Sequence, residues 1–262
     1  MAEGAIRIGV AGALGRMGVA VAAQVAARPG LDVTAWFDRP GTQGQTAPGG
    51  VLVAREAALP LCDVIVDFTS GQASAELAGL CAERGGPALV VGTTGLSEEH
   101  EAAVTRAAER IAVVRSGNFS LGVNVLLSLV NQAAAILKAR DFDIEVFEAH
   151  HKRKVDAPSG TALMLGQAAA EGRGVDLKAV KVAARDGITG ARAEGTIGFS
   201  VVRGGGIVGE HSVIFAGEEE VLTLSHSARD RTLFARGAVE AAAFVAGKPA
   251  GLYDMQDVLG LK

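Results

Sequence analysis

The densest polar stretch of the chain is EAHHKRKVDAPSGTA, residues 148–162. Two adjacent histidines, His150 and His151, precede three cations and a turn at Pro158. An imidazole can deliver a proton near neutral pH, and cations form charge-assisted hydrogen bonds with anions. The stretch therefore predicts an anion site with an acid beside it.

A helix is expected to begin just after this turn, at residues 159–161. The N–H groups of a helix N-terminus bind carboxylates. With Lys154 and an imidazole, they would suit a small molecule that carries two carboxylates and a bond to be reduced. Lys152 and Arg153, although conspicuous, are expected to be solvated surface residues.

Two other uses of this stretch fit its residues less well. A zinc site needs three or four converging ligands, but His100, His211 and His226 are scattered and no cysteine is near. We therefore expect no metal. A basic localisation or heparin-like motif is also conceivable, but HKRK is short and lies between a strand and a helix.

A second stretch, GVAGALGRMG, follows the first expected strand and opens a helix, with glycines at positions 9, 12, 15 and 18. Such a turn brings backbone N–H groups and a helix N-terminus close to a pyrophosphate. The match is loose, because the usual spacing would place a glycine at Leu14, and a glycine turn that binds nothing is the alternative.

Residues after the next strands favour the dinucleotide interpretation. Asp38 lies about twenty residues after the last glycine, where an acid bonds an adenosine ribose. Arg39 could pair with a 2′-phosphate, so both NADH and NADPH are expected as cofactors. The segments 92–95, GTTG, and 116–120, SGNFS, each end a strand, and Phe119 could pack against a nicotinamide.

The surrounding pattern predicts an α/β fold in two parts. Short β-branched runs alternate with Ala-rich helical runs, which indicates a Rossmann-like parallel sheet. The expected strands are 5–11, 31–37, 62–68, 87–93 and 111–116. The expected helices are 15–27, 71–84 and 97–109, the last capped by Ser97, and residues 39–50 are expected to form a loop.

After about residue 118 the pattern predicts a second, α+β domain with an open mixed sheet. Its expected elements are a helix at 121–139, a strand at 142–150, a helix at 161–171 and an antiparallel meander over 178–227. A final helix is expected at 230–246. We expect the second domain to pair with another subunit and the protein to be an oligomer, because the exposed edges of an open sheet need to be covered.

Composition excludes several classes of protein. The 262 residues carry a net charge of −4, which argues against a nucleic-acid partner. Cys62 and Cys81 have no metal or CxxC spacing and are expected to be buried thiols in a reducing compartment, the cytoplasm. The start of the chain is expected to be a strand, not a signal peptide. The uncharged segment 116–137 contains Asn and Gln, so a buried helix is preferred to a membrane span.

Several motifs together resemble a known family, bacterial 4-hydroxy-tetrahydrodipicolinate reductase, also called dihydrodipicolinate reductase. They are GALGRMG, GTTG, NFSLGVNV, EAHHKRKVDAPSGTA, GTIGFSVVRGGGIVGEH and GLYDMQDVLG, in this order along nearly the whole chain. The resemblance implies a cytoplasmic homotetramer that uses NADH or NADPH to reduce a cyclic imine-type dicarboxylate on the diaminopimelate and lysine pathway. It also implies that the final helix and tail return to the cofactor domain. Residues 1–120 and 231–262 would then bind the dinucleotide, and residues 121–230 would bind substrate and form the oligomer.

The resemblance implies a role for individual residues as well. Catalysis falls to His150, the acid/base, and to Lys154, its proton-donating or anion-pairing partner. Substrate carboxylates would be held by His151, Gly160 and Thr161. Cofactor contacts would come from Gly12, Ala13, Leu14, Gly15, Arg16, Met17, Asp38, Arg39, Gly92, Thr93, Thr94, Ser116, Gly117, Asn118 and Phe119. Asp38 and Gly117 depart from the commonest residues of the family, which bears on cofactor preference.

Two rival functions remain open from the sequence. Another two-domain NAD(P)H reductase, such as an aldehyde or amino-acid dehydrogenase, would want a catalytic cysteine or a different histidine context. Neither cysteine lies in a loop built for attack. A dinucleotide sensor that has lost catalysis should lack His150, Lys154 or the 159–161 turn, and all are present.

Overall fold

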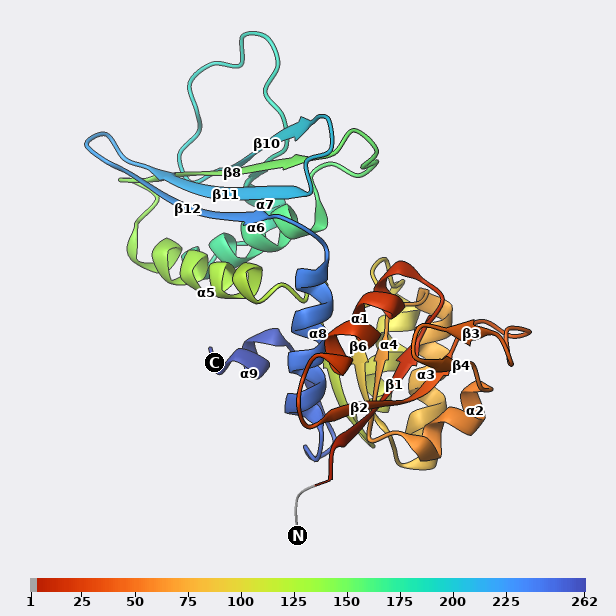
Figure 1. The fold of residues 1–262 in the computed structure, drawn as a ribbon. Helices are drawn as coiled ribbons and strands as arrows, with labels where there is room; N and C mark the ends of the chain where they lie inside the picture. The colour runs from red at the N-terminus through yellow and green to blue at the C-terminus, as the bar shows by residue number, and fades with distance from the viewer. Residues whose placement is uncertain (1–3) are drawn as a thin grey trace. The chain divides into compact units, whose positions relative to one another are not determined.

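The computed structural model describes residues 4–262, which form two compact units (Figure 1). The first unit runs up to Leu121 and resumes with Thr232–Gly260, and the second unit is Gly122–Arg231. The chain therefore leaves the first unit once and returns to it for its last helices.

The first unit is built on a six-stranded sheet in the order β13-β7-β6-β5-β1-β2, and every pairing in it is parallel. Its strands are β1 (Ile6–Ala11), β2 (Leu31–Phe37), β5 (Val64–Asp67), β6 (Ala88–Val91), β7 (Ala112–Arg115) and β13 (Gly251–Tyr253). The expected strands are confirmed within about two residues at each end, because parallel strands buried on both faces read as short apolar runs.

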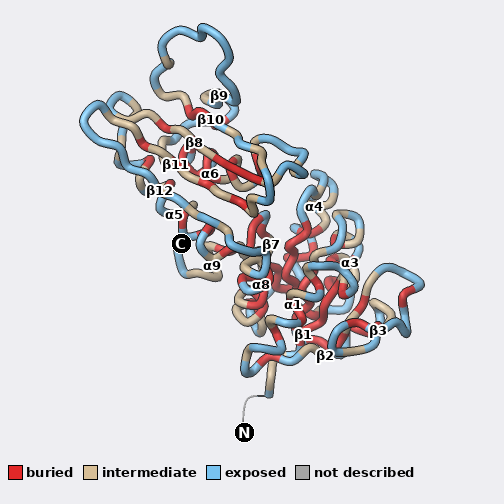
Figure 2. The backbone as a smooth tube through the Cα atoms, turned by 45° about the horizontal axis from the view of Figure 1, so that its top comes forward, coloured by how far each residue is buried: buried red, intermediate tan, exposed pale blue. Residues whose placement is uncertain are grey.

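Helices cover both faces of this sheet. Successive side chains of β5 alternate between them: Val64 and Val66 join the cluster under α1 and α8, whereas Ile65 joins the cluster under α3 and α4. These buried segments are red in Figure 2. The helices are α1 (Arg16–Ala26), α2 (Arg55–Ala58), the 3-10 helix η1 (Leu59–Leu61), α3 (Gly71–Arg84), α4 (Glu98–Ala107), α8 (Thr232–Val245) and α9 (Met255–Leu259).

The second unit has a five-stranded mixed sheet in the order β12-β11-β8-β10-β9, with α5 and α6 packed on one face. Its elements are α5 (Leu121–Ile136), β8 (Asp143–His150), α6 (Gly160–Arg173), α7 (Leu177–Val180), β9 (Lys181–Val182), β10 (Ile197–Arg203), β11 (Gly209–Ala216) and β12 (Val221–Ala228). The parallel sheet of the first unit and this mixed sheet confirm the expected fold class.

The antiparallel meander expected over 178–227 is wrong. Strand β10 pairs in parallel with β8 and β9, and only β11 and β12 form an antiparallel hairpin. Strand β8 lies between β10 and β11, so the glycine-rich turn that joins them passes over the end of β8 instead of closing a hairpin. Alternation along a strand reports which side chains are buried, but it does not identify the partner strand.

Smaller features also differ from expectation or support it. Part of the loop expected at 39–50 forms a short hairpin, β3 (Thr46–Ala47) with β4 (Gly50–Val51). Ser97 caps α4 as predicted, since its side chain accepts from the N–H of His100. In the part of the chain that the structure describes, no helix is long and apolar enough to cross a membrane.

Candidate active site

The turn after β1 has the backbone of a pyrophosphate-binding turn. Gly12 has a φ of +68°, in the left-handed region that favours glycine. Gly15 precedes α1 as its N-cap. At Gly18 a Cβ atom would lie 2.2 Å from the carbonyl oxygen of Gly12, so only glycine allows the helix to start this close to the turn. The looser glycine spacing therefore still forms a tight turn.

Asp38 connects this turn to the end of β2. Its carboxylate accepts hydrogen bonds from the backbone N–H of Leu14 at 3.0 Å and of Arg39 at 2.8 Å. The Arg39 side chain is exposed and makes no hydrogen bond or ion pair with another described residue. The Asp38 carboxylate is thus placed to bond a ribose hydroxyl, and the Arg39 guanidinium is available to pair with a 2′-phosphate.

These residues border a hollow of about 650 Å³ at the carboxyl ends of β1, β2 and β5. The chain runs from β1 to β2 on one side of β1, and then to β5 on the other. Open α/β sheets bind ligands at this kind of switch point. The hollow is lined by Ala11, Gly12, Leu14, Gly15, Phe37, Asp38, Arg39, Pro40, Gln43, Arg55, Glu56, Phe68, Thr69, Ser70, Ala73, Glu76 and Leu77.

The other predicted cofactor residues do not line this hollow. Thr93 is buried, and its hydroxyl accepts from the N–H of Thr69 and from the hydroxyl of Ser74. Phe119 is buried and packs its ring edge-to-face with Phe68, centroids 5.8 Å apart. Of the remaining members, Ala13 lies in the glycine turn and Arg16 and Met17 begin α1. The others follow the ends of β6 and β7: Gly92, Thr94, Ser116, Gly117 and Asn118.

His150, the last residue of β8, is held by a buried carboxylate. Its Nδ1 lies 2.6 Å from Oε2 of Glu148, which is 0% exposed and two residues earlier on the same face of the strand. Burial raises the pKa of Glu148, but bonds from Arg203, His150 and the Ser159 N–H outweigh it, so the pKa lies below its usual value. Glu148 is therefore an anion facing the imidazole.

Helix α6 begins beside the same carboxylate. Ser159 is its N-cap: the side-chain oxygen accepts from the N–H of Ala162 at 3.2 Å, and the Ser159 N–H donates to Oε1 of Glu148 at 2.9 Å. Gly160 and Thr161 form the first turn of the helix, as expected. His150 and the N-terminus of α6 are therefore both bonded to the side chain of Glu148.

Lys154 lies in the turn that joins β8 to α6. Its ammonium forms an ion pair with Asp156 at 2.9 Å. Arg203, on β10, secures the same turn, because its Nη2 donates to the Asp156 carbonyl oxygen at 2.6 Å. Lys152 and Arg153 are exposed, as expected for solvated surface.

His151 lies just beyond the strand and takes a different partner. Its Nε2 is 3.1 Å from Nη2 of Arg231. Partial burial, followed by the charges of Arg153 and Arg231, lowers the pKa of His151. This histidine is therefore disposed to remain neutral.

Sequence reasoning assigned no site role to Glu148, Arg203 or His211. His211 is buried, its Nε2 lies 3.1 Å from the Ser159 hydroxyl, and its ring packs edge-to-face with that of His150 at 5.0 Å. Burial, followed by the charge of His150, lowers its pKa to about 4. Glu148 could have been found from its two-residue spacing to His150, whereas the other two carry no local signal.

The two cysteines are free and buried, as expected. Burial raises the pKa of Cys62 to about 11 and that of Cys81 to about 12, so neither thiol is a ready nucleophile. Residues 4–262 also contain no group of three His, Cys, Asp or Glu side chains arranged to hold a metal ion.

A parallel sheet with a glycine turn at its switch point, and a second unit with a buried imidazole–carboxylate pair, define a dinucleotide-dependent oxidoreductase. Family models of the N- and C-terminal domains of dihydrodipicolinate reductase match residues 6–119 and 122–259. The chain belongs to the dihydrodipicolinate reductase family.

Individual relatives agree. The chain is 63% identical over 257 residues to the 4-hydroxy-tetrahydrodipicolinate reductase of Caulobacter vibrioides, covering 98% of each chain. It is 52% identical to that of Anaeromyxobacter sp., again over 98% of each. Its fold is similar to a dipicolinate-bound dihydrodipicolinate reductase from Paenisporosarcina sp. TG-14, with a TM-score of 0.78, 26% identity and coverage of 97% and 98%.

Proposed function

We propose that the chain reduces 4-hydroxy-tetrahydrodipicolinate to tetrahydrodipicolinate with NADH or NADPH, in diaminopimelate and lysine biosynthesis. The observation that carries this proposal is the buried Glu148, which joins His150 to the N-terminus of α6. That arrangement places a proton donor beside a carboxylate-binding helix end. The substrate, a ring with two carboxylates, needs both.

The first unit is proposed to hold the cofactor. The close approach at Gly18 and the left-handed Gly12 fit a pyrophosphate, and Asp38 and Arg39 would contact the adenosine ribose. When bound, the nicotinamide supplies the hydride. Because the carboxylate serves a ribose hydroxyl and the guanidinium serves a 2′-phosphate, we expect both NADH and NADPH to bind.

The second unit is proposed to bind the substrate and supply the proton. Lys154 and the first turn of α6 would hold the two carboxylates, with His151 alongside. Loss of the ring hydroxyl as water would give the conjugated imine, hydride would add to its electrophilic carbon, and His150 would protonate the resulting enamine. The support is the anionic Glu148, whose carboxylate bonds Nδ1 and so orients the imidazole ring. The dipicolinate held by the relative from Paenisporosarcina has the same two-carboxylate chemistry.

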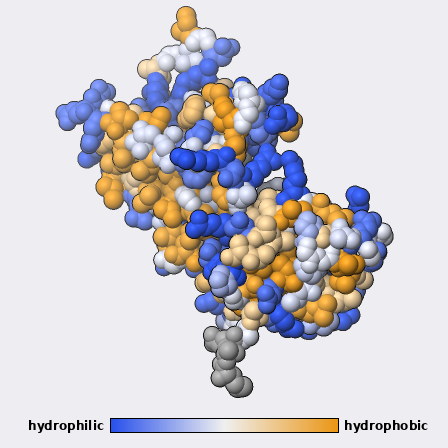
Figure 3. Space-filling view, viewed as in Figure 1, coloured by the Kyte–Doolittle hydropathy of each residue, from blue (hydrophilic) through white to orange (hydrophobic). Residues whose placement is uncertain are grey.

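We propose a homotetramer in the cytoplasm, assembled through the uncovered face of the mixed sheet. One face of this sheet packs on α5 and α6. On β11 the side chains of Ser212, Ile214 and Ala216 point to the other face and are only partly buried. Their cross-strand neighbours include Phe147 and Val221, the latter 62% exposed. Figure 3 shows apolar residues at the surface among polar ones. Small and apolar residues suit packing against a second sheet.

The test is NADH oxidation at 340 nm, with substrate generated by the preceding synthase from pyruvate and aspartate semialdehyde. Oxidation is expected only when both precursors are present. If NADH binds but is not oxidised, the chain is a dinucleotide sensor and the proposed function is wrong.

A further inference from the structure

Glu148 is the most heavily bonded buried carboxylate around the site. A carboxylate has about four lone-pair positions, and this one has four donors in reach. Oε2 accepts from His150 Nδ1 at 2.6 Å and from Arg203 Nη1 at 2.7 Å. Oε1 accepts from the Ser159 N–H at 2.9 Å and from Arg203 Nη2 at 2.7 Å. No acceptor position remains for another partner.

The four donors belong to three residues on three different elements. His150 ends β8, Ser159 caps α6, and Arg203 ends β10. Through Arg203, which also donates to the carbonyl oxygen of Asp156, the same carboxylate secures the turn that carries Lys154. One side chain therefore sets the relative positions of the acid, the helix N-terminus and the lysine.

The contact also decides which nitrogen of His150 can react. A carboxylate only accepts hydrogen bonds, so Nδ1 must carry a proton, and Nε2 is left for the substrate. On that side the imidazole faces Gly209, where a Cβ atom would lie 3.2 Å from Nε2. The missing side chain thus leaves space beside the reacting nitrogen.

We propose that Glu148 is the positioning residue of this site: it fixes the ring orientation of His150, with Nδ1 protonated and Nε2 toward the substrate, and aligns the N-terminus of α6 with it. This inference rests on the proposed reductase function, in which His150 is the acid. Glu148 itself would touch neither substrate nor cofactor.

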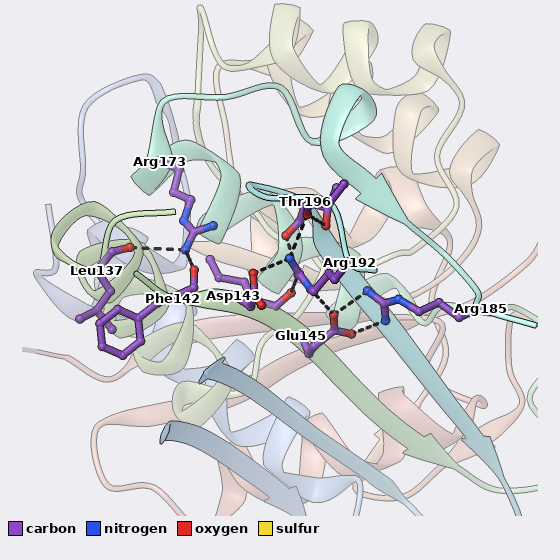
Figure 4. Close-up of polar contacts among 10 residues, drawn as sticks. Leu137, Phe142, Asp143, Glu145, Arg173, Arg185, Arg192 and Thr196 are labelled. Carbon is purple, nitrogen blue, oxygen red and sulfur yellow. Dashed lines mark hydrogen bonds and ion pairs between the residues drawn. The ribbon is translucent and has the colours of Figure 1, made fainter. Parts of the chain in front are cut away.

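The first test is Glu148→Gln, with Glu145→Gln as the matched control. An amide nitrogen cannot accept hydrogen bonds, so either His150 or Ser159 loses its partner. Glu145 lies on the same strand and is also bonded by two arginines, Arg185 and Arg192, but neither of these contacts belongs to the site (Figure 4).

We expect kcat/KM of Glu148→Gln to fall at least about tenfold, a part of the about 10²–10⁴-fold that positioned acid–base catalysis contributes. Glu145→Gln should stay within about twofold of wild type on the same scale. Circular dichroism and denaturant unfolding of the whole chain check that each variant is folded, since both residues lie in the second unit. Near-native kcat/KM in folded Glu148→Gln would overturn the proposal.

The second test is made on the wild-type protein and needs no catalysis. In wild-type protein carrying ¹⁵N only in its histidine rings, NMR should show a proton on Nδ1 of His150 from pH 6 to 9, with the signal assigned by its loss in His150→Gln. A bare Nδ1 would overturn the inference. If wild type does not reduce the substrate, the proposed function fails, whereas this measurement still decides the role of Glu148.

Discussion

At the scale of single residues, His150 and Lys154 are expected to affect the reaction differently. His150→Gln should lower kcat by about 10²–10⁴-fold with little change in KM, because it removes the proton donor. Lys154→Ala should impair both parameters, since the ammonium takes part in binding and in chemistry. Steady-state kinetics with synthase-generated substrate measures both.

The control for this pair is Lys152→Ala, which removes an exposed cation of the same turn and should change neither parameter. The assignment is wrong if His150→Gln and Lys154→Ala both keep near-native kcat/KM.

Arg39 is expected to discriminate between the two cofactors. Arg39→Ala should weaken NADPH binding by about 10–100-fold, which corresponds to a charge-assisted hydrogen bond of about 1.5–3 kcal/mol. NADH lacks the 2′-phosphate and should bind almost unchanged. Calorimetric titration of both cofactors into wild type and variant measures this difference, and equal losses would contradict the 2′-phosphate role.

At the scale of elements, two helical glycines should respond in opposite ways to substitution by alanine, because one packs against the glycine turn and the other does not. Gly18→Ala places a methyl group 2.2 Å from the Gly12 carbonyl oxygen and should destabilise the protein by about 1–3 kcal/mol and weaken NADH binding. Gly79→Ala, inside α3 with no atom within 4 Å of the new methyl group, should stabilise by about 0.5–1 kcal/mol.

Denaturant unfolding and NADH titration of both variants provide the measurements. If Gly18→Ala is as stable as Gly79→Ala and binds NADH normally, the close approach of helix and turn is not needed.

Because of His211, on β11, the free energy of unfolding should depend on pH. The pKa of this histidine is about 4 in the folded protein and about 6.5 when unfolded. The unfolded chain thus binds more protons between these values, and stability should fall as pH drops from about 6.5 to about 4, by at most about 3 kcal/mol. Urea unfolding across this range should show a shallower pH slope in His211→Gln.

Other groups face the same region and contribute to the slope. Burial also lowers the pKa of His226, so this histidine adds to the loss of stability as pH falls. The pKa of Glu148 is lowered as well, and the stability that this carboxylate contributes is lost at still lower pH. Both remain in His211→Gln, so only part of the slope should disappear. An unchanged slope would contradict the buried, neutral state of His211.

At the scale of the whole molecule, the uncovered sheet face should determine assembly. Ile214→Lys places a charge on the outward side of β11 and should reduce the mass measured by light scattering on a sizing column from that of a tetramer. Val51→Lys, on the exposed short hairpin of the other unit, should not. A wild-type chain that elutes as a monomer would refute the tetramer.

Sequence patterns predicted the first unit better than the second. Strands such as β5 and β6 were recognisable because a parallel sheet covered on both faces uses continuous apolar runs between helical segments. In the second unit the strand segments were also found, but the place of β10 was not. Pairing is set by contacts between distant segments, and a hairpin turn and a crossover turn can both be rich in glycine.

The sequence by itself determined the residue types for the chemistry: the histidine, the lysine, the helix N-cap and the glycine turn, each readable because its effect is local. Only the tertiary structure decided which residues hold them in place. Glu148 and Arg203 lie 55 positions apart and meet because β8 and β10 pair in parallel. Burying that carboxylate requires several donors at once, and only a folded chain can bring them to one point.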